Sequence, residues 1–287
     1  MKANEQFSLG ALFLNIILFA GKLFAGLISN SVALISDALE SLGDILTSVG
    51  ILIAVRTGNK PADKCHPFGH HRAEPLAGFI VAMFTAIIGF QVVVLGFRRF
   101  FKPAQTHITF IVLFIVIVAM LVKLVMYFVF LNKGKKLNSP ALTALGIDAR
   151  NDVVRSIIIL AAVISTEFGV FWFESVVAIS LGAMLFHSAY FLGIKNVDML
   201  MGKAPSKRFL DHVKREAKKF PNVLGVGDIR AHYAGNSINL EIVVMMNPLM
   251  TVKKSHDVAS KLRDKIQEHP EINRVFVHID PASNKSK

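Results

Sequence analysis

Long apolar blocks fill the first two thirds of this sequence. Six of them reach the roughly 20 residues that a helix needs to cross the hydrocarbon core of a bilayer. They lie near residues 8–29, 32–56, 75–98, 107–131, 140–166 and 170–194. Of the 287 residues, 53% are hydrophobic and the mean hydropathy is +0.52, which is high for a soluble enzyme. The pattern predicts an α-helical membrane protein with six transmembrane helices.

The basic residues of the connecting loops predict the orientation of these helices. They gather in the loops 56–74 and 132–139, whereas the first and fifth connections carry no Lys or Arg. By the positive-inside rule, both basic loops and both termini lie in the cytoplasm. Arg98, Arg99 and Lys102 do not follow this rule, because the predicted orientation puts them on the outer side. No signal peptide is recognisable before the first span, so we expect that span to stay in the mature protein. We expect a multi-pass protein of the plasma or inner membrane.

The sequence changes character after about Asn196, which predicts a transmembrane domain over residues 1–200 and a cytoplasmic domain over residues 204–282. The tail predicts an α+β domain of order αββαβ, with a ferredoxin-like sheet and helices on one face. Ala234-Gly-Asn is a hairpin turn signal, and Thr251 is an expected N-cap. The expected elements are helices 206–220 and 251–268 and strands 224–233, 237–246 and 274–279.

The net charge of +12 needs an explanation other than nucleic acid. From Lys203 onward, the sequence contains 16 Lys and Arg residues and 9 Asp and Glu residues. No nucleic-acid-binding motif accompanies these basic residues. A basic tail below a membrane is typical of a surface close to anionic membrane lipid. Cys65 is the only cysteine, which excludes an intrachain disulfide and a thiolate metal cage built by one chain.

Two pairs of carboxylates interrupt the apolar blocks. Glu40 and Asp44 lie in the second predicted span, and Asp148 and Asp152 lie in the fifth. Residues four apart share one face of a helix, and bare charges inside a membrane are costly, so a bound cation or protons must neutralise them. The alternative is a set of structural ion pairs with Lys22, Lys123, Arg150 or Arg155. Asp37 lies three residues before Glu40. It either joins the site or supports it from outside, and we do not include it among the predicted ligands.

An all-oxygen site favours Mn²⁺ over Zn²⁺, which more often takes His or Cys ligands. Mg²⁺ is disfavoured because it keeps its waters. Fe²⁺, Co²⁺, Ni²⁺ and Zn²⁺ stay open as substrates. Clustered carboxylates repel one another when no metal is bound, so the empty site should hold protons that an arriving metal expels. Coupled to alternate opening, this chemistry predicts an exchange of divalent metal for protons.

Two further groups of possible metal ligands lie outside the spans. Asp63, His66 and His70 are closely spaced in the loop that follows the second span, where the alternative is a solvated loop that caps the next helix. In the tail, His278 and Asp280 share one face of the last strand, and His256 begins the amphipathic helix. His232 is a further candidate. Ordinary surface histidines are the alternative here.

These motifs together resemble the cation diffusion facilitator family of divalent-metal/proton antiporters. The motifs are Asn30-Ser-Val-Ala-Leu-Ile-Ser-Asp-Ala-Leu-Glu-Ser-Leu-Gly-Asp44, Pro61-Ala-Asp-Lys-Cys-His-Pro-Phe-Gly-His-His-Arg-Ala-Glu74, Asp148-Ala-Arg-Asn-Asp152 and Val277-His-Ile-Asp-Pro281. The resemblance implies that the four carboxylates form the transport site and that Asp63, His66 and His70 form a loop site. It also implies a homodimer that exports metal, with the tail as a metal-responsive dimerisation domain. Gly227 stands where family members have a tail-site histidine, so this chain keeps His256, His278 and Asp280 of that set.

Other classes of protein explain the sequence less well. An intramembrane aspartyl protease would need a Gly-x-Gly-Asp motif, but Ser41-Leu-Gly-Asp44 lacks its first glycine. A metal hydrolase would need a helix motif such as His-Glu-x-x-His, which the sequence does not contain. A metal sensor that transports nothing is distinguished from a transporter only by a flux measurement. The sequence therefore favours a transporter and not an enzyme.

Overall fold

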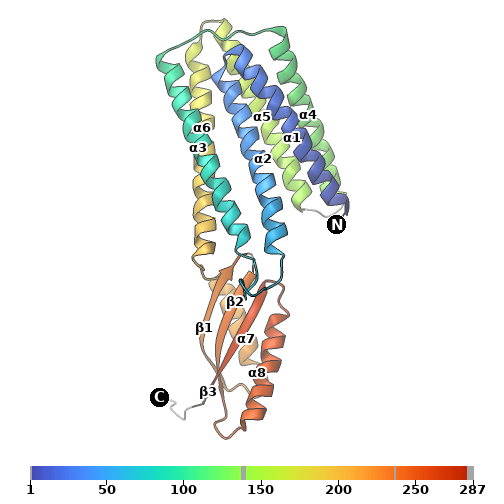
Figure 1. Cartoon of the computed structure of the whole chain (residues 1–287), viewed down its shortest axis with the longest axis vertical. Helices are drawn as coiled ribbons and strands as arrows, with labels where there is room; N and C mark the ends of the chain where they lie inside the picture. The colour runs from blue at the N-terminus through green and yellow to red at the C-terminus, as the bar shows by residue number, and fades with distance from the viewer. Residues whose placement is uncertain (1, 137–139, 236, 283–287) are drawn as a thin grey trace. The chain divides into compact units, whose positions relative to one another are not determined.

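The structure, a computed structural model, describes residues 2–136, 140–235 and 237–282. Six long helices precede a small α+β tail (Figure 1). The helices are α1 Lys2–Ser29, α2 Val32–Gly58, α3 Ala73–Phe101, α4 Phe110–Lys136, α5 Pro140–Glu167 and α6 Phe171–Leu200. The chain forms two compact units, one of Met1–Gly50 with Ile80–Gly193 and the other of Ile51–Phe79 with Ile194–Lys287. The predicted domain boundary at residues 200–204 stays a prediction.

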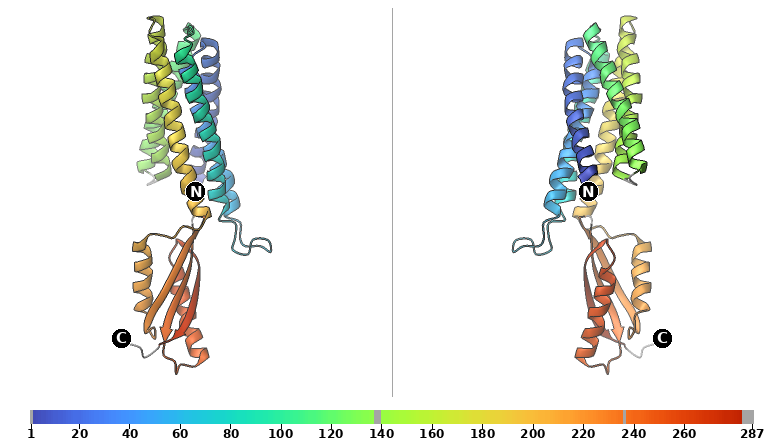
Figure 2. Two further views of the ribbon diagram at one scale, coloured as in Figure 1. Left: turned by 90° about the vertical axis from the view of Figure 1, so that its left-hand side faces the viewer. Right: turned by 90° about the vertical axis from the view of Figure 1, so that its right-hand side faces the viewer.

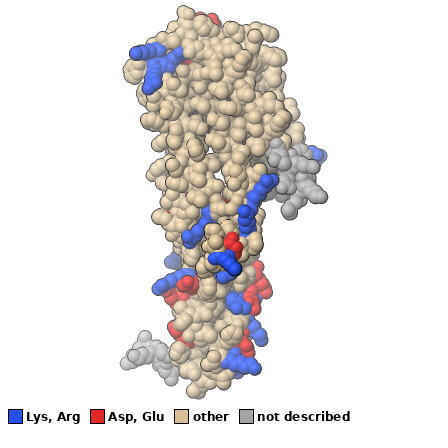
Figure 3. Space-filling model, viewed as in Figure 1, with Lys and Arg blue, Asp and Glu red and all other residues tan. Residues whose placement is uncertain are grey.

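The helical membrane fold is confirmed. Within the described residues, five helices are long and apolar enough to cross a membrane, namely Gly10–Ser29 of α1 and all of α2, α3, α4 and α6. Large apolar side chains such as Phe84, Phe114 and Phe186 are exposed along them, and Figure 3 shows an almost uncharged surface over these helices. Helix α5 has the length of a span, at 28 residues, but carries four charged residues in its first 16. It needs neighbours that shield those charges from lipid.

Small apolar residues hold the helices of the first unit together. One buried cluster takes Ala25 from α1, Leu34 from α2, Val112 from α4, Ile159 from α5 and Val177 from α6. Helix α4 packs against both α5 and α1, and a second buried cluster joins the three helices through Ala11, Met126 and Leu142. Helices α3 and α6 run side by side (Figure 1) and approach closely at Gly89 and Gly182, where a Cβ atom on either would lie under 3 Å from backbone atoms of the other helix.

Helices α1 and α2 form a tight hairpin. Helix α1 ends at Ser29 and α2 begins at Val32, with Asn30 in the left-handed conformation at φ 53°. Asparagine is among the few non-glycine residues that adopt this conformation readily. Ser31 then starts α2, because its hydroxyl oxygen accepts from the backbone N–H of Leu34 at 3.2 Å.

A buried acid near this hairpin pairs with one of the three basic residues that oppose the predicted orientation. Glu174, in the first turn of α6, is 1% exposed and accepts from the hydroxyls of Ser31 at 2.6 Å and Thr106 at 3.0 Å. Arg99 Nε lies 3.8 Å from Glu174 Oε2, and the Arg99 guanidinium also donates to the carbonyl of Asn30. Arg99 is therefore a buried, paired residue of α3 and does not act as a free loop charge in setting orientation.

Glu174→Ala should destabilise the helical unit by about 3–5 kcal/mol, because it leaves the buried Arg99 charge and two hydroxyls unpaired. Thermal unfolding of the detergent-solubilised protein checks this. The double variant Arg99→Met/Glu174→Leu should recover a large part of the loss, since it removes both charges together. Glu167→Ala, at the exposed end of α5, is the control and should change little. Equal stability of Glu174→Ala and Glu167→Ala would contradict the role of Glu174.

The tail has the predicted αββαβ order. Its elements are α7 Lys207–Lys218, β1 Gly225–Ala234, β2 Ser237–Met246, α8 Val252–Gln267 and β3 Ile272–Pro281. The strand order is β1-β2-β3, with β1 antiparallel and β3 parallel to β2. Thr251 is the N-cap of α8 as predicted, but β3 begins two residues earlier than expected. Asn236, in the predicted turn, lies outside the described residues.

Alternation along β2 creates one buried and one open face of the sheet. Leu240, Ile242, Val244 and Met246 are buried with residues of α7 and α8 in one core, while Glu241 and Met245 are exposed. Figure 2 shows the two helices packed against the three strands. On β3, Phe276 and His278 are also exposed, so the face that carries them has no helix over it within the described chain.

Candidate metal sites

The structure brings acidic residues of α2 and α5 together. The guanidinium of Arg155, on α5, contacts Glu40 through Nη1 and Asp152 through Nη2. Lys123, on α4, places its Nζ 2.6 Å from Asp152 Oδ2 and donates to Asn15 Oδ1 at 2.8 Å. Ion pairs with Lys123 and Arg155, which the sequence left open as an alternative, are therefore present in this conformation.

The remaining charged residues near the pairs are arranged differently. Asp37 is 4% exposed and pairs with Lys22 of α1, with Nζ 2.9 Å from Oδ1. That pair is neutral by itself, so Asp37 adds no net negative charge to the predicted metal site. Arg150 is exposed, and its guanidinium donates to the neighbouring Asn151 side chain at 3.3 Å.

Burial divides the four carboxylates into an inner and an outer pair. Asp152 is buried and Glu40 is half-buried, whereas Asp44 and Asp148 are exposed. Asp44 and Asp148 both lie within electrostatic range of Asp152. A carboxylate exposed on a membrane helix is tolerated when it faces water or protein and not lipid. We therefore call Asp152 and Glu40 the inner pair and Asp44 and Asp148 the outer pair.

The formal charges leave this cluster unbalanced. Lys123 and Arg155 match two of the four negative charges, and two remain. One divalent cation or two protons would neutralise them. The Arg155 guanidinium is also incompletely bonded, because its Nε is buried without a hydrogen-bond partner among the described atoms. An unsatisfied buried donor is unfavourable, so displacing this guanidinium costs less than breaking a fully bonded pair.

The loop between α2 and α3 brings together the three residues predicted there. Asp63 Oδ1 lies 3.5 Å from His66 Nδ1, and Asp63 Oδ2 lies 3.4 Å from His70 Nε2. The ligand atoms of all three lie within 4.8 Å of one another. The backbone N–H groups of His66 and Cys65 donate to Asp63 Oδ1 at 2.6 and 2.9 Å and hold the pKa of Asp63 below its usual value. This carboxylate therefore stays charged, and available to a cation, in mildly acidic solution.

Asp63 has two separable roles, which Asp63→Asn and Asp63→Ala should distinguish. Asparagine keeps an oxygen that accepts from both backbone N–H groups but loses the charge, whereas alanine loses both. We expect both variants to lower the affinity of the loop for metal by about 10-fold or more, and only Asp63→Ala to increase proteolysis of the loop. Calorimetric titration and limited proteolysis check this. Cys65→Ser is the control, and equal metal binding by all three variants would argue against a loop site.

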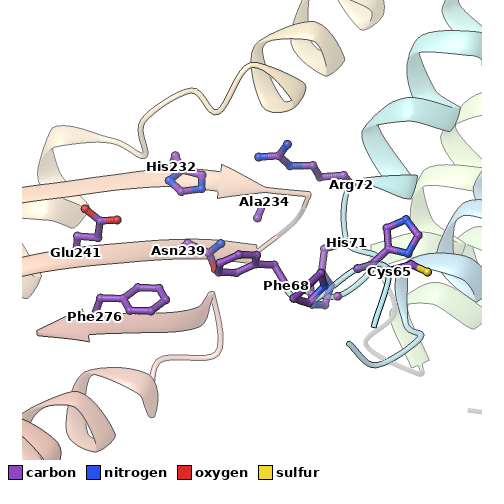
Figure 4. A pocket seen from close by; sticks show the side chains of 12 residues that line it. Cys65, Phe68, His71, Arg72, His232, Ala234, Asn239, Glu241 and Phe276 are labelled. Atoms are coloured by element: carbon purple, nitrogen blue, oxygen red, sulfur yellow. The ribbon is translucent and has the colours of Figure 1, made fainter. Parts of the chain in front are cut away.

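A pocket adjoins this loop in the second unit. It has a volume of about 690 Å³ and is lined by Cys65, His71 and Arg72 of the loop and by His232 and Phe276 of the strands (Figure 4). The Arg274 guanidinium lies over the Phe68 ring, 5.5 Å from its centroid. Among the described residues, the pocket wall does not bring three metal ligands within range of one ion. The exposed Cys65 thiol thus lines the pocket without joining a ligand group.

The predicted tail residues are only partly brought together. His278 Nε2 lies 3.1 Å from Asp280 Oδ1 on the open face of the sheet. His278 also lines a hollow together with Asp228 and Glu241. His256 belongs to α8, on the covered face, and its Nδ1 lies 3.8 Å from Asp257. His256, His278 and Asp280 are not one group of ligands within the described chain. The site that they were expected to form stays a prediction.

Sequence reasoning missed another group in the tail. His212, Glu216 and His269 place one ligand atom each within 4.8 Å of the others. The signal that the sequence offered was the spacing of His212 and Glu216, four residues apart in a predicted helix. Glu174 was also missed, although an acid beside Phe171-Trp-Phe at the start of an apolar block is an intramembrane charge that calls for a partner.

Comparison with known proteins places these sites in a family context. Residues 8–201 match the family model of the cation efflux transmembrane domain, and residues 205–282 match that of the cation efflux protein cytoplasmic domain. An uncharacterised transporter of Methanocaldococcus jannaschii is 30% identical over 93% of this chain and 94% of its own. The manganese efflux system proteins MneP and MneS of Bacillus subtilis are each 27% identical, over 97% and 99% of this chain and 96% and 98% of theirs.

Proposed function

Because the chain belongs to the cation efflux family, whose members are multi-pass membrane transporters and not enzymes, we propose that it exports divalent metal from the cytoplasm in exchange for protons. Efflux of divalent metal follows from the family. The metal, the counter-ion and the site are our proposals. Mn²⁺ is the favoured substrate, and Fe²⁺, Co²⁺, Ni²⁺ and Zn²⁺ are the other candidates.

The proposed transport site consists of Glu40, Asp44, Asp148 and Asp152. The observation that carries this proposal is the Arg155 guanidinium, which joins Glu40 of α2 to Asp152 of α5 and so puts acids from both helices in one cluster. Only oxygen ligands are offered there, which favours Mn²⁺. The names of two relatives as manganese efflux proteins agree with this choice.

Lys123 and Arg155 act in this proposal as resident counter-charges. They stabilise the carboxylates between transport events and reduce the formal charge of the cluster to that of one divalent cation. Metal that enters past Asp44 and Asp148 takes the place of the Arg155 contacts and of bound protons. Since two protons neutralise the same charge, an exchange of about two protons for one metal ion leaves the site electrically balanced in both states.

The orientation of the chain is proposed from its charges. With both termini and the tail in the cytoplasm, the loop site of Asp63, His66 and His70 lies where metal arrives. The membrane is proposed to be the plasma or inner membrane. We also propose a homodimer, supported by the open sheet face that exposes Met245 and Phe276. Light scattering of the solubilised protein should give twice the chain mass of 31.6 kDa.

Transport in proteoliposomes tests the proposed function. With a pH gradient imposed across the vesicle membrane, Mn²⁺ flux should follow the proton gradient and reverse when the gradient is reversed. Each of the other divalent ions is then offered in competition with Mn²⁺. Flux of Mn²⁺ that is indifferent to the gradient would contradict proton exchange, and preference for another ion would correct the substrate.

A further inference from the structure

A cluster with two histidines and a glutamate lies on the helical side of the tail and shares no residue with the proposed transport site. His212 and Glu216 are four residues apart on α7, and His269 follows α8 by two residues, in the turn that leads to β3. Residues four apart lie on one face of a helix, so His212 and Glu216 both face the turn that carries His269. Their ligand atoms all lie within 4.8 Å of one another.

The cluster is held in place by the core beneath it. Val213 and Ala217, the next residues after His212 and Glu216, are completely buried against the sheet and fix the rotation of α7. The turn is fixed as well, because the carbonyl of His269 accepts from the N–H of Ile272 at 2.9 Å. The site is thus positioned by packed elements.

Side-chain contacts already join the three residues. His269 Nε2 and Glu216 Oε2 form a hydrogen bond of 2.7 Å, and both side chains are largely buried, at 29% and 25% exposed. The His212 ring lies edge-on to that of His269, with centroids 5.7 Å apart and the planes at 86°. His212 is exposed, so the cluster has a fixed inner pair and an outer ligand open to solvent.

Nearby charge does not exclude a cation. Lys265, on the last turn of α8, has its Nζ 2.6 Å from Glu268 Oε2, so the negative charge of Glu268 offsets its positive charge. The Glu268 contact also raises the pKa of Lys265. Glu216 keeps its hydrogen bond to His269, and a metal ion bound between the two side chains would take the place of that bond.

We propose that His212, Glu216 and His269 bind a divalent metal of the zinc class and thereby join α7 to the turn between α8 and β3. Two imidazole nitrogens and one carboxylate oxygen suit Zn²⁺, with bonds of about 2.0–2.2 Å and a fourth position for water. Ligand atoms around such a tetrahedral ion lie about 3.3 Å apart, so the 2.7 Å hydrogen bond has only to open slightly. Mn²⁺ prefers oxygen ligands, and this site therefore discriminates against the ion favoured for transport.

Counting bound zinc in the full-length protein tests the proposal. Detergent-solubilised protein is dialysed against Zn²⁺ at neutral pH, and the metal is measured by mass spectrometry. The variant His212→Gln/His269→Gln should bind about one Zn²⁺ fewer per chain than the unsubstituted protein. The control variants Asp211→Asn, an exposed acid on α7, and His107→Gln, an exposed histidine outside the tail, should retain the full count.

A single substitution distinguishes the loss of a metal ligand from misfolding of the tail. His212→Gln keeps the Glu216–His269 hydrogen bond and the buried faces of α7, yet it should weaken binding at this site by at least about 10-fold. Co²⁺ offers a spectroscopic check, because a four-coordinate Co²⁺ ion with nitrogen ligands has an absorption band in visible light. The difference spectrum between the unsubstituted protein and His212→Gln should show that the variant has lost this band. An unchanged zinc count in the double variant, or an unchanged Co²⁺ spectrum in His212→Gln, would overturn the proposal.

Discussion

Asp44→Ala should abolish proton-driven Mn²⁺ transport in proteoliposomes. Asp44 is exposed and lies within electrostatic range of Asp152, so its removal takes away a ligand and a negative charge without leaving a buried cation unpaired. Losing a residue that only hydrogen-bonds to a metal ligand typically lowers metal affinity or activity 10–100-fold. Losing a direct ligand should cause a larger decrease. We therefore expect flux to fall by at least about 100-fold, to the leak of empty vesicles.

Two further variants make this prediction decisive. Asp152→Ala should also abolish transport, although it leaves Lys123 and Arg155 without their partner and lowers stability as well. Glu167→Gln removes an exposed acid at the end of α5, the helix that carries Asp152, and should transport normally. Full flux in both Asp44→Ala and Asp152→Ala would reject the four-carboxylate site.

Arg155→Gln should tighten Mn²⁺ binding by at least about 10-fold while it slows transport. The guanidinium occupies the space between Glu40 and Asp152, and its removal leaves one more negative charge for the metal. At an effective dielectric constant near 20, an extra charge about 5 Å from a divalent ion contributes several kcal/mol before relaxation, well above the 1.4 kcal/mol that a tenfold change requires. Tighter binding retards release, so turnover should fall.

The affinity is measured on solubilised protein by electron paramagnetic resonance of free Mn²⁺ at mildly alkaline pH, where protons compete least. Arg150→Gln is the matched control, since Arg150 lies on the same helix but is exposed and contacts Asn151. It should bind Mn²⁺ with unchanged affinity. Weaker or unchanged binding by Arg155→Gln would mean that Arg155 is part of a structural ion pair and not a displaceable counter-charge.

The sequence predicted the elements of this fold well because their signals are local. Apolar blocks locate the long helices, and Thr251 caps α8 as its side-chain chemistry suggests. The tight turn at Asn30 follows from the few residues between two apolar blocks. Helix α5 differs from the other long helices, because apolar residues alone do not explain its place in the membrane. Asp148, Arg150, Asp152 and Arg155 make it the least apolar of the six, so its place in the membrane depends on neighbours that a hydropathy window does not detect.

The candidate sites were predictable only where their residues lie close in the sequence. Asp63, His66 and His70 fall within one loop, and the structure brings them together. The bonds of Lys123 and Arg155 to the carboxylates depend on how α4 packs on α5 and on which rotamers that packing permits. Glu174 pairs with an arginine 75 residues away, and Glu216 with a histidine 53 residues away. Without a fold, many other pairings were equally open.

The most direct test of the central claim is to locate the transported ion. Crystals of the full-length protein grown with Mn²⁺ should show anomalous scattering at the manganese edge among the carboxylate oxygens of Glu40, Asp44, Asp148 and Asp152, with the Arg155 guanidinium moved away from Glu40. If the anomalous signal lies elsewhere, and Arg155 still joins Glu40 to Asp152 at saturating Mn²⁺, the four carboxylates are not the transport site.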